Sequence, residues 1–362
     1  MKNNGKPNGI EEYLESRADE INKIIYESLT MVSSNRSIEK LLGRSGYKYD
    51  QETIKKGILE PSIYLFNAGG KRWRPVMLLL MVEAFGKDPK EYMEFSLIPE
   101  VIHNGTLVHD DIEDNSPMRR NQPAVHVKYG VDVATNLGDF MYFFPLAALT
   151  DSPKLSKEEK NQILSIFVKE MTRLSIGQAT DITWHKHMVD PRSISEENYL
   201  QMVFDKTGVL ARMASKIGAV LGGADEETVE EMGRFGAAIG VAFQIQDDLL
   251  NITENSVSVS KGGIGEDITE GKRTIMVINS IKKGNKKDSD RLIEILDMHT
   301  PDQKLIREAI AIIDKTNSKE YAKDVAEKIV KDAWAAVDKK IPQSAAKDRL
   351  KQLAEFLIQR SV

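Results

Sequence analysis

Two clusters of acidic residues lie far apart in the chain, each inside an apolar stretch with helical periodicity. The first, His-Asp-Asp-Ile-Glu-Asp, spans 109–114, and the second, Gln-Ile-Gln-Asp-Asp-Leu-Leu-Asn, spans 244–251. In each cluster an aspartate and an oxygen-bearing residue four positions later share one helix face. Adjacent carboxylates in apolar surroundings are costly unless a cation neutralises them. Oxygen ligands of this kind suit hard divalent ions.

If the two helices face each other, their oxygens converge on one cavity, where they would hold Mg²⁺ and through it a diphosphate group. The alternative is two solvated acidic helix turns, in a chain with 55 aspartate and glutamate residues. One cluster alone would leave that alternative open, whereas two clusters in apolar settings favour a metal site.

Basic residues flank both clusters. The turn Gly-Gly-Lys-Arg-Trp-Arg-Pro (69–75) places three cations at the start of a helix, where backbone amides and the helix dipole favour an anion. After the first cluster Pro117 stops the helix, and Arg119 and Arg120 follow it. Further cations lie near or after the second cluster: Lys206, Lys261, Lys272 and Arg273. Each group alone is typical of an ordinary turn or surface, but beside metal-binding carboxylates they favour diphosphate.

Almost the whole chain has apolar residues at three- and four-residue steps, which predicts an all-α fold. The expected helices are 11–33, 52–67, 73–86, 91–114, 132–149, 156–180, 195–222, 225–254, 272–283, 288–298, 302–314, 319–338 and 344–360. No linker rich in Pro, Gly or Ser divides the body. We therefore expect one helical domain, 1–315, with a C-terminal helical extension, 316–362, packed on it. The glycine-rich segment 261–274 is expected to be a mobile lid.

Composition narrows the function classes. The chain has 362 residues, 41% of them hydrophobic, and a formal charge of −5. This net charge gives no sign of the basic surface that is typical of nucleic-acid-binding proteins. It has no cysteine, which fits a reducing compartment, and we expect a cytoplasmic protein. The polar N-terminus is not expected to be a signal peptide. The strongest apolar run, 76–85, is short and contains Glu83, so no membrane span is expected. Peripheral membrane contact stays open.

From about Gly69 to Thr274 the chain resembles the trans-isoprenyl diphosphate synthases, also called polyprenyl synthetases. The resemblance follows seven motifs in order: the Gly-Gly-Lys-Arg-x-Arg-Pro turn with His103, the Asp-Asp-x-x-Asp cluster with its Arg-Arg pair, Gly138-Asp139, Gln178 with Asp181, Lys206-Thr207, Phe243-Gln244-Ile245-x-Asp-Asp, and the pair Lys261 and Lys272. It implies a single bundle of mostly antiparallel helices around a deep central cavity.

The resemblance also implies the reaction and the residues that perform it. Isopentenyl diphosphate would condense head-to-tail with an allylic diphosphate: the allylic C1–O bond ionises, the isopentenyl double bond attacks the cation, and the released diphosphate takes a proton. About three Mg²⁺ ions would be held by Asp110, Asp111, Asp114, Asp247 and Asp248. The allylic diphosphate would be bound by Arg119, Lys206, Lys261 and Lys272. Isopentenyl diphosphate would be bound by Lys71, Arg74, His103 and Arg120.

Some positions allow two interpretations. Thr207 and Gln244 match family positions that face the reacting carbons, where their oxygens would stabilise the allylic cation. The alternative is that they only make a hydrogen bond within the core. Gln178 and Asp181 would orient a metal-bound water or, alternatively, fix helix packing. Asn251 departs from the family pattern, which has a third aspartate there, and is a weaker candidate ligand.

Product length is expected from the helix that carries the first cluster. The fifth and fourth residues before Asp110 are Gly105 and Thr106, both small, so the growing tail should pass them. Deeper floor candidates are Ile102 and the run 141–144, although the latter also fits plain core packing. We expect geranylgeranyl diphosphate, with a longer polyprenyl diphosphate as the alternative.

Other functions and the assembly complete the expectations. A terpene cyclase would not need a second diphosphate pocket, and a non-catalytic subunit of a heteromeric synthase would have lost motifs that this chain keeps. The resemblance implies a homodimer, for which apolar faces on 91–108 and 132–149 would supply the interface.

Overall fold

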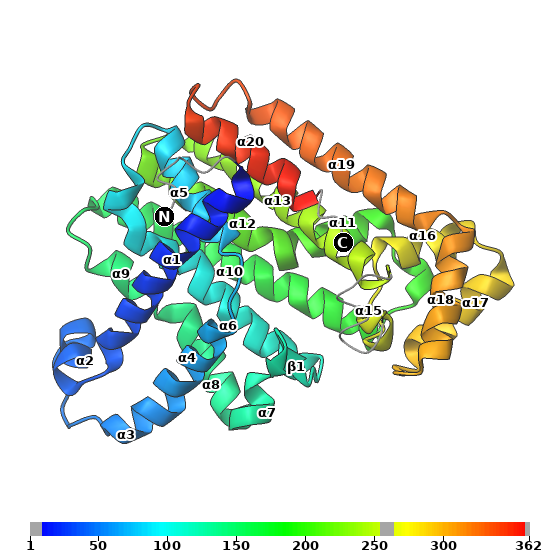
Figure 1. Ribbon diagram of the computed structural model, residues 1–362, viewed down its shortest axis with the longest axis horizontal. Coiled ribbons are helices and arrows are strands. Elements are labelled where there is room, and N and C mark those ends of the chain that lie inside the picture. The colour runs from blue at the N-terminus through cyan, green and yellow to red at the C-terminus, as the bar shows by residue number, and fades with distance from the viewer. Residues whose placement is uncertain (1–8, 254–263, 359–362) are drawn as a thin grey trace, which may run out of the picture. The chain divides into compact units, whose positions relative to one another are not determined.

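The computed structural model describes residues 9–253 and 264–358, and nearly all of their regular structure is helical (Figure 1). The predicted all-α class is therefore confirmed. The chain forms two compact units, Met1–Leu164 with Ile217–Ala224, and Ser165–Lys216 with Asp225–Val362. Helices α10 (Lys157–His185) and α12 (Val209–Gly222) contribute residues to both units.

The first unit is built around a helix that is buried on all sides. Every residue of α5 (Trp73–Ala84) except Glu83 is buried, as expected of a helix that is apolar all round. Helices α1 (Ile10–Leu29) and α6 (Leu97–Glu113) pack on it. Its other helices are α2 (Asn35–Leu42), α3 (Gln51–Ile54), α4 (Glu60–Asn67), α7 (Val125–Tyr129), α8 (Val131–Phe143) and α9 (Leu146–Thr150). The turns η1 (Thr30–Val32), η2 (Lys55–Leu59) and η3 (Pro89–Ser96) connect them, and η2 is π-helical.

A short hairpin follows α6 in this unit. Strand β1 (Met118–Arg119) pairs antiparallel with β2 (Gln122–Pro123), in a register that sets Arg119 opposite Gln122. The two turn residues, Arg120 and Asn121, both have positive φ values, 51° and 64°. Positive φ at both central positions defines the tight turn whose twist matches a hairpin, although glycine or asparagine usually occupies it.

The second unit has α13 (Glu226–Asn251) at its centre. Helix α19 (Ser318–Val337) runs along α13, and α20 (Ala345–Ile358) packs on both (Figure 1). The other helices are α11 (Glu196–Val203), α15 (Glu266–Thr269), α16 (Ile275–Lys283), α17 (Lys286–Asp297) and α18 (Gln303–Lys315), with the turns η4 (Pro191–Ser193) and η5 (Phe204–Gly208). The expected C-terminal extension thus packs inside this unit, while the boundary between 1–315 and 316–362 stays a prediction.

Sequence periodicity missed several short elements: helices α2, α7 and α15, the turn η4 and the hairpin. It also missed breaks inside predicted helices, at η2 in 52–67 and between α8 and α9 in 132–149. The predicted helix 195–222 is interrupted by η5, a single π-helical turn. Turns of this kind are frequent at functional sites.

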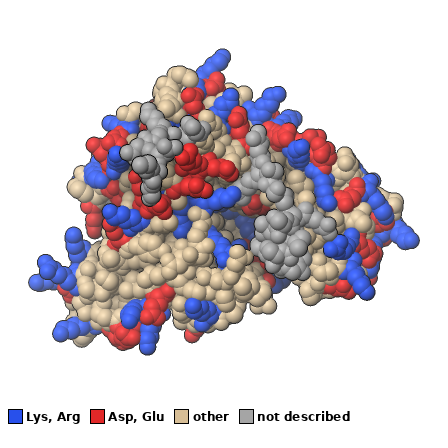
Figure 2. Space-filling view, viewed as in Figure 1, with Lys and Arg blue, Asp and Glu red and all other residues tan. Residues whose placement is uncertain are grey.

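The surface of the described residues is mixed in charge. Lysine and arginine side chains are interspersed with aspartate and glutamate over the face drawn in Figure 2. In the same part of the chain, no helix is long and apolar enough to cross a membrane.

Candidate active site

The first acidic cluster occupies the C-terminal end of α6. Asp110 and Asp111 lie in its last turn and Asp114 is its C-cap. Asp111 is buried, and Arg119 donates hydrogen bonds from Nε, at 2.8 Å, and from its second terminal nitrogen to Asp111 Oδ1. Burial raises the pKa of the Asp111 carboxyl, and the Arg119 guanidinium opposes this. Asp111 Oδ2 is also buried and accepts no hydrogen bond, which is costly for a carboxylate oxygen and suits a cation.

The hairpin sends its two adjacent arginines in different directions. Arg119 pairs with Asp111, whereas Arg120 donates to the carbonyl of Gly69 in the glycine turn before α5. Arg119 belongs to strand β1, whereas Arg120 is the first residue of the turn and has a φ of 51°. Their assignment to different diphosphates stays a prediction.

A group of cations surrounds His103 on α6. Burial and then the positive charges of Arg74, Arg120, Arg119 and Arg72 hold the pKa of His103 well below its ordinary value. The imidazole is therefore neutral at pH 7 and lies in a strongly positive field. Arg74 is buried, with its guanidinium 4.5 Å from the centre of the Trp73 ring, and Lys71 is exposed at the preceding turn. Such a field favours a polyanion.

Arg72 has a different role from its neighbours in the turn. It is buried and pairs with Glu100 at 2.5 Å, and it also donates to Asn22. It therefore ties α5 to α1 and α6. Glu100 was not predicted as part of the site, although a lone glutamate at a core position of α6 indicates a buried ion pair.

The second acidic cluster lies near the C-terminal end of α13. Asp247 is half-buried and Asp248 is buried. Both oxygens of Asp248 accept side-chain hydrogen bonds, from Gln244 Nε2 at 2.7 Å and from Tyr199 OH at 2.8 Å. Burial raises the pKa of Asp248, and these two hydrogen bonds oppose it. Tyr199 was not among the predicted residues; a tyrosine on a buried helix face gave no clear signal, because it fits core packing equally well.

The π-helical turn η5 carries Lys206 and Thr207. Lys206 Nζ donates to the buried carboxylate of Asp181 on α10 at 2.5 Å, and Thr207 donates to Gln244 Oε1 at 3.0 Å. Asp181 thus ties α10 to η5, which is the helix-packing role left open for it. The Thr207 hydroxyl likewise makes the core hydrogen bond left open in the sequence analysis, and its acceptor is the other candidate, Gln244.

The glycine-rich region after α13 is partly outside the described residues. Lys261 falls in that part, so its predicted role stays a prediction. Lys272 pairs with Glu270 at 2.5 Å and lies 4.0 Å from Asp267, beside the short helix α15. Asn251 Oδ1 accepts a hydrogen bond from the backbone of Asp267. Asn251 therefore holds the start of α15, and its role as a weaker metal ligand stays a prediction.

Comparison with known proteins decides the family. The model of the family described as polyprenyl synthetase matches residues 55–313. The chain belongs to the polyprenyl synthetase family.

Its relatives agree with this family. The chain is 34% identical over 307 residues to a geranylgeranyl diphosphate synthase of Saccharolobus solfataricus, covering 84% of this chain and 91% of the relative. It is 36% identical over 269 residues to a short chain isoprenyl diphosphate synthase of Methanothermobacter thermautotrophicus, covering 74% and 80%. The crystal structure of a geranylgeranyl pyrophosphate synthetase from Pyrococcus horikoshii superposes with a TM-score of 0.77 at 30% identity, covering 95% of this chain and all of that one. The chain is thus a prenyltransferase with the isoprenoid synthase fold.

Within each unit of this synthetase, predicted site residues come together. The first unit gathers the cluster at the end of α6, Arg119, Arg120, Arg74 and His103. The second gathers Thr207, Gln244 and Asp248 in one hydrogen-bonded group, and the charge of Lys272 acts on Asp248. Among the described residues, no three histidine, aspartate or glutamate side chains are arranged to hold a metal by themselves.

The surroundings of Gly105 contradict the expectation that the growing prenyl tail passes beside it. A Cβ placed on it would lie 3.0 Å from the carbonyl oxygen of Gly138 and 3.0 Å from Met141 Cβ, both on α8. The missing side chain therefore lets α6 and α8 pack closely and leaves no space for a prenyl tail. Thr106, on the adjacent face of α6, is half-buried and remains the candidate.

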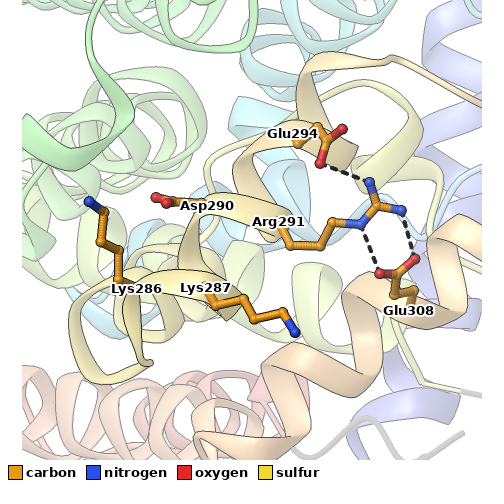
Figure 3. A pocket seen from close by; sticks show the side chains of 6 residues that line it. All are labelled: Lys286, Lys287, Asp290, Arg291, Glu294 and Glu308. Carbon is orange, nitrogen blue, oxygen red and sulfur yellow. Dashed lines mark hydrogen bonds and ion pairs between the residues drawn. The ribbon is translucent and has the colours of Figure 1, made fainter.

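A shallow depression on α17 and α18 has a different character (Figure 3). It is lined by Lys286, Lys287, Asp290, Arg291, Glu294 and Glu308. Arg291 donates to Glu308 at 2.8 and 2.9 Å and to Glu294 at 2.8 Å, so these charges neutralise one another. None of the predicted site residues lies in this depression.

Proposed function

We propose that this prenyltransferase condenses isopentenyl diphosphate head-to-tail with an allylic diphosphate to give all-trans geranylgeranyl diphosphate. One observation carries the proposal: four arginines act on His103 beside the first acidic cluster, and of the two that follow the cluster Arg119 pairs with Asp111, whereas Arg120 bonds to Gly69 in the glycine turn. A terpene cyclase takes one diphosphate and needs no second group of cations. Relatives named geranylgeranyl diphosphate synthase support the product.

The cations are assigned to two substrates. Isopentenyl diphosphate is bound by Lys71, Arg74, His103 and Arg120. The neutral imidazole of His103 donates one hydrogen bond, and the arginines supply the charge. The allylic diphosphate is bound by Arg119, Lys206, Lys261 and Lys272. Lys206 has its ammonium held by Asp181, which fixes its position before the substrate arrives.

The carboxylates suit magnesium, the metal on which the family depends. The proposed ligands are Asp110, Asp111, Asp114, Asp247 and Asp248, all of them hard oxygen donors. Mg²⁺ is usually held by one or two carboxylates together with substrate phosphate oxygens, which agrees with the lack of a complete protein cage among the described residues. The buried, unbonded Asp111 Oδ2 is a ready ligand. When bound, the metal would neutralise charge on the departing diphosphate.

The side chains of the chain supply the remaining steps. Lys206 and Lys272 stabilise the negative charge that develops as the allylic C1–O bond breaks. Thr207 and Gln244 offer oxygen atoms to the allylic cation. The isopentenyl double bond then attacks C1, which leaves a tertiary cation on the isopentenyl unit. The released diphosphate takes a proton from the carbon beside that cation, and the new double bond forms there.

The test is incubation of the purified chain with Mg²⁺, isopentenyl diphosphate and farnesyl diphosphate. A twenty-carbon linear prenyl diphosphate is the expected product, and a longer linear product would change only the chain length. A cyclised hydrocarbon, or no reaction, would contradict the proposal.

A matched pair of variants checks the carboxylates. Asp110→Asn should lower turnover by at least about a hundredfold, since stabilising the leaving group is the main catalytic effect. Glu113→Gln, three residues later on the exposed side of the same helix, should leave turnover unchanged.

We further propose a homodimer. Helix α6 is largely buried inside its own unit, so the face expected on 91–108 is not available for an interface. Among the exposed apolar residues are Phe143 on α8 and Val168 and Ile176 on α10. A monomeric mass by light scattering would contradict the dimer, and Ile176→Lys should weaken it.

A further inference from the structure

Tyr199 ends a chain of hydrogen bonds in the second unit. It lies on α11 with 1% of its surface exposed, and its hydroxyl donates to Asp248 Oδ2 at 2.8 Å. Gln244 Nε2 donates to the other oxygen of Asp248 at 2.7 Å. Thr207 Oγ1 then donates to Gln244 Oε1 at 3.0 Å. The chain links α11, α13 and η5, and every donor in it points toward Asp248.

The carboxylate fixes the direction of this chain. An ionised carboxylate only accepts hydrogen bonds, so Gln244 must turn its NH₂ group toward Asp248. Its carbonyl oxygen then faces Thr207, and the Thr207 hydroxyl has to donate its single proton to it. A hydroxyl that has given its proton offers only lone pairs to any other group. The opposite amide orientation would set an oxygen of Gln244 against an oxygen of Asp248, which is repulsive.

Tyr199 holds the carboxylate that sets this direction. Its hydroxyl comes from a helix other than the one that bears Asp248, so it prevents the carboxylate from rotating away from Gln244. We propose that Tyr199 is a positioning residue which, through Asp248 and Gln244, keeps the lone pairs of Thr207 directed to the electron-poor carbon of the allylic substrate. The inference rests on the proposed function, since that carbon belongs to the proposed reaction.

The first experiment is Tyr199→Phe, which removes one hydroxyl group. With saturating Mg²⁺ and both substrates, kcat should fall by between about 10- and 100-fold. The KM for isopentenyl diphosphate should stay within about twofold, and the melting temperature, measured in parallel, should stay above the assay temperature. The matched control is Tyr321→Phe, which removes a tyrosine hydroxyl bonded to Glu196, one turn before Tyr199 on the same helix. The kcat of this control should equal that of the unsubstituted chain.

A double-mutant cycle separates the relay from a general structural role. In a Thr207→Val background, which has no hydroxyl to direct, adding Tyr199→Phe should lower kcat by no more than about twofold. In a Thr207→Ser background, which keeps the hydroxyl, the loss should return to between about 10- and 100-fold. A structural role of Tyr199 would lower kcat equally in both backgrounds.

Three results would overturn the inference: unchanged kcat in Tyr199→Phe, losses that multiply in the Thr207→Val background, or recovery of the variant at higher Mg²⁺, which would mean that Tyr199 acts on metal binding. Elongation by the unsubstituted chain is measured first. If that chain elongates and the cycle fails, only the inference is wrong. If that chain does not elongate, the proposed function is wrong and the inference falls with it.

Discussion

Gly177 on α10 lies directly against the backbone of Lys206 in η5. A Cβ placed on Gly177 would come within 2.9 Å of Lys206 Cα and 2.6 Å of the Asp205 carbonyl carbon, and would overlap the Lys206 nitrogen. On the far side of the turn, Gly240 of α13 approaches Gly208 equally closely. Backbone packs on backbone at both contacts, so the π-helical turn is held closely against α10 and α13. The position of the Lys206 ammonium is therefore set by two glycines as well as by Asp181.

Gly177→Ala should displace this turn. Overpacking of this kind costs about 1–3 kcal/mol of unfolding free energy, and the shift should raise the KM for the allylic substrate more than that for isopentenyl diphosphate. Denaturant unfolding and steady-state kinetics measure the two effects. Gly57→Ala is the control, since its Cβ would meet nothing within 4 Å in the helical turn η2; it should leave the allylic KM unchanged.

Arg74→Gln and Lys206→Gln should separate the two diphosphate groups. Each removes one charge-assisted contact, worth about 1.5–3 kcal/mol, or roughly 10- to 100-fold in affinity. Arg74→Gln should raise the KM for isopentenyl diphosphate, and Lys206→Gln that for the allylic substrate. Glutamine is preferred to alanine at Lys206, because its amide can still donate to the buried Asp181. If both variants raised the same KM, the assignment of the cations would be wrong.

The depressed pKa of His103 predicts a pH-dependent stability. The unfolded chain binds a proton at His103 below about pH 6.5, whereas burial and the neighbouring arginines keep the folded form neutral to lower pH. The folded state therefore loses stability as the pH falls from about 6.5 toward the pKa in the folded protein. Between about pH 7.5 and pH 5, the melting temperature of His103→Asn should fall by less than that of the unsubstituted chain. Equal losses in the two proteins would contradict the positive field at His103.

Thr106→Phe should shorten the product toward farnesyl diphosphate. Thr106 is one helical turn, about 5 Å, before Asp110 on the same face of α6, so a phenyl ring there would block a tail running toward the N-terminus of the helix. Gly105→Phe should instead lower the stability, because α8 fills the space beside it. Product analysis by chromatography distinguishes the outcomes. An unchanged product in Thr106→Phe would place the end of the tail elsewhere.

The sequence by itself determined the helices and the chemical groups of the site. Apolar residues at three- and four-residue steps predicted nearly every long helix, because that periodicity is a local property of the chain. The order of the motifs around Asp110, Lys206 and Asp247 indicated the family, which the comparisons confirmed. Short helices such as α2 and α7 were not predicted, because helices of this length depend on tertiary packing for their stability.

Only the tertiary structure decided which groups are paired. Arg72 and Glu100 are 28 residues apart, and Tyr199 and Asp248 are 49 apart. No local spacing links such residues, since their contact depends on how helices pack. The same packing decided that Gly105 faces α8, that Asn251 fixes the start of α15, and that Asp248 is held on both oxygens. Residue types indicated metal and diphosphate chemistry, whereas the direction of each hydrogen bond followed from the folded arrangement of acceptors and donors.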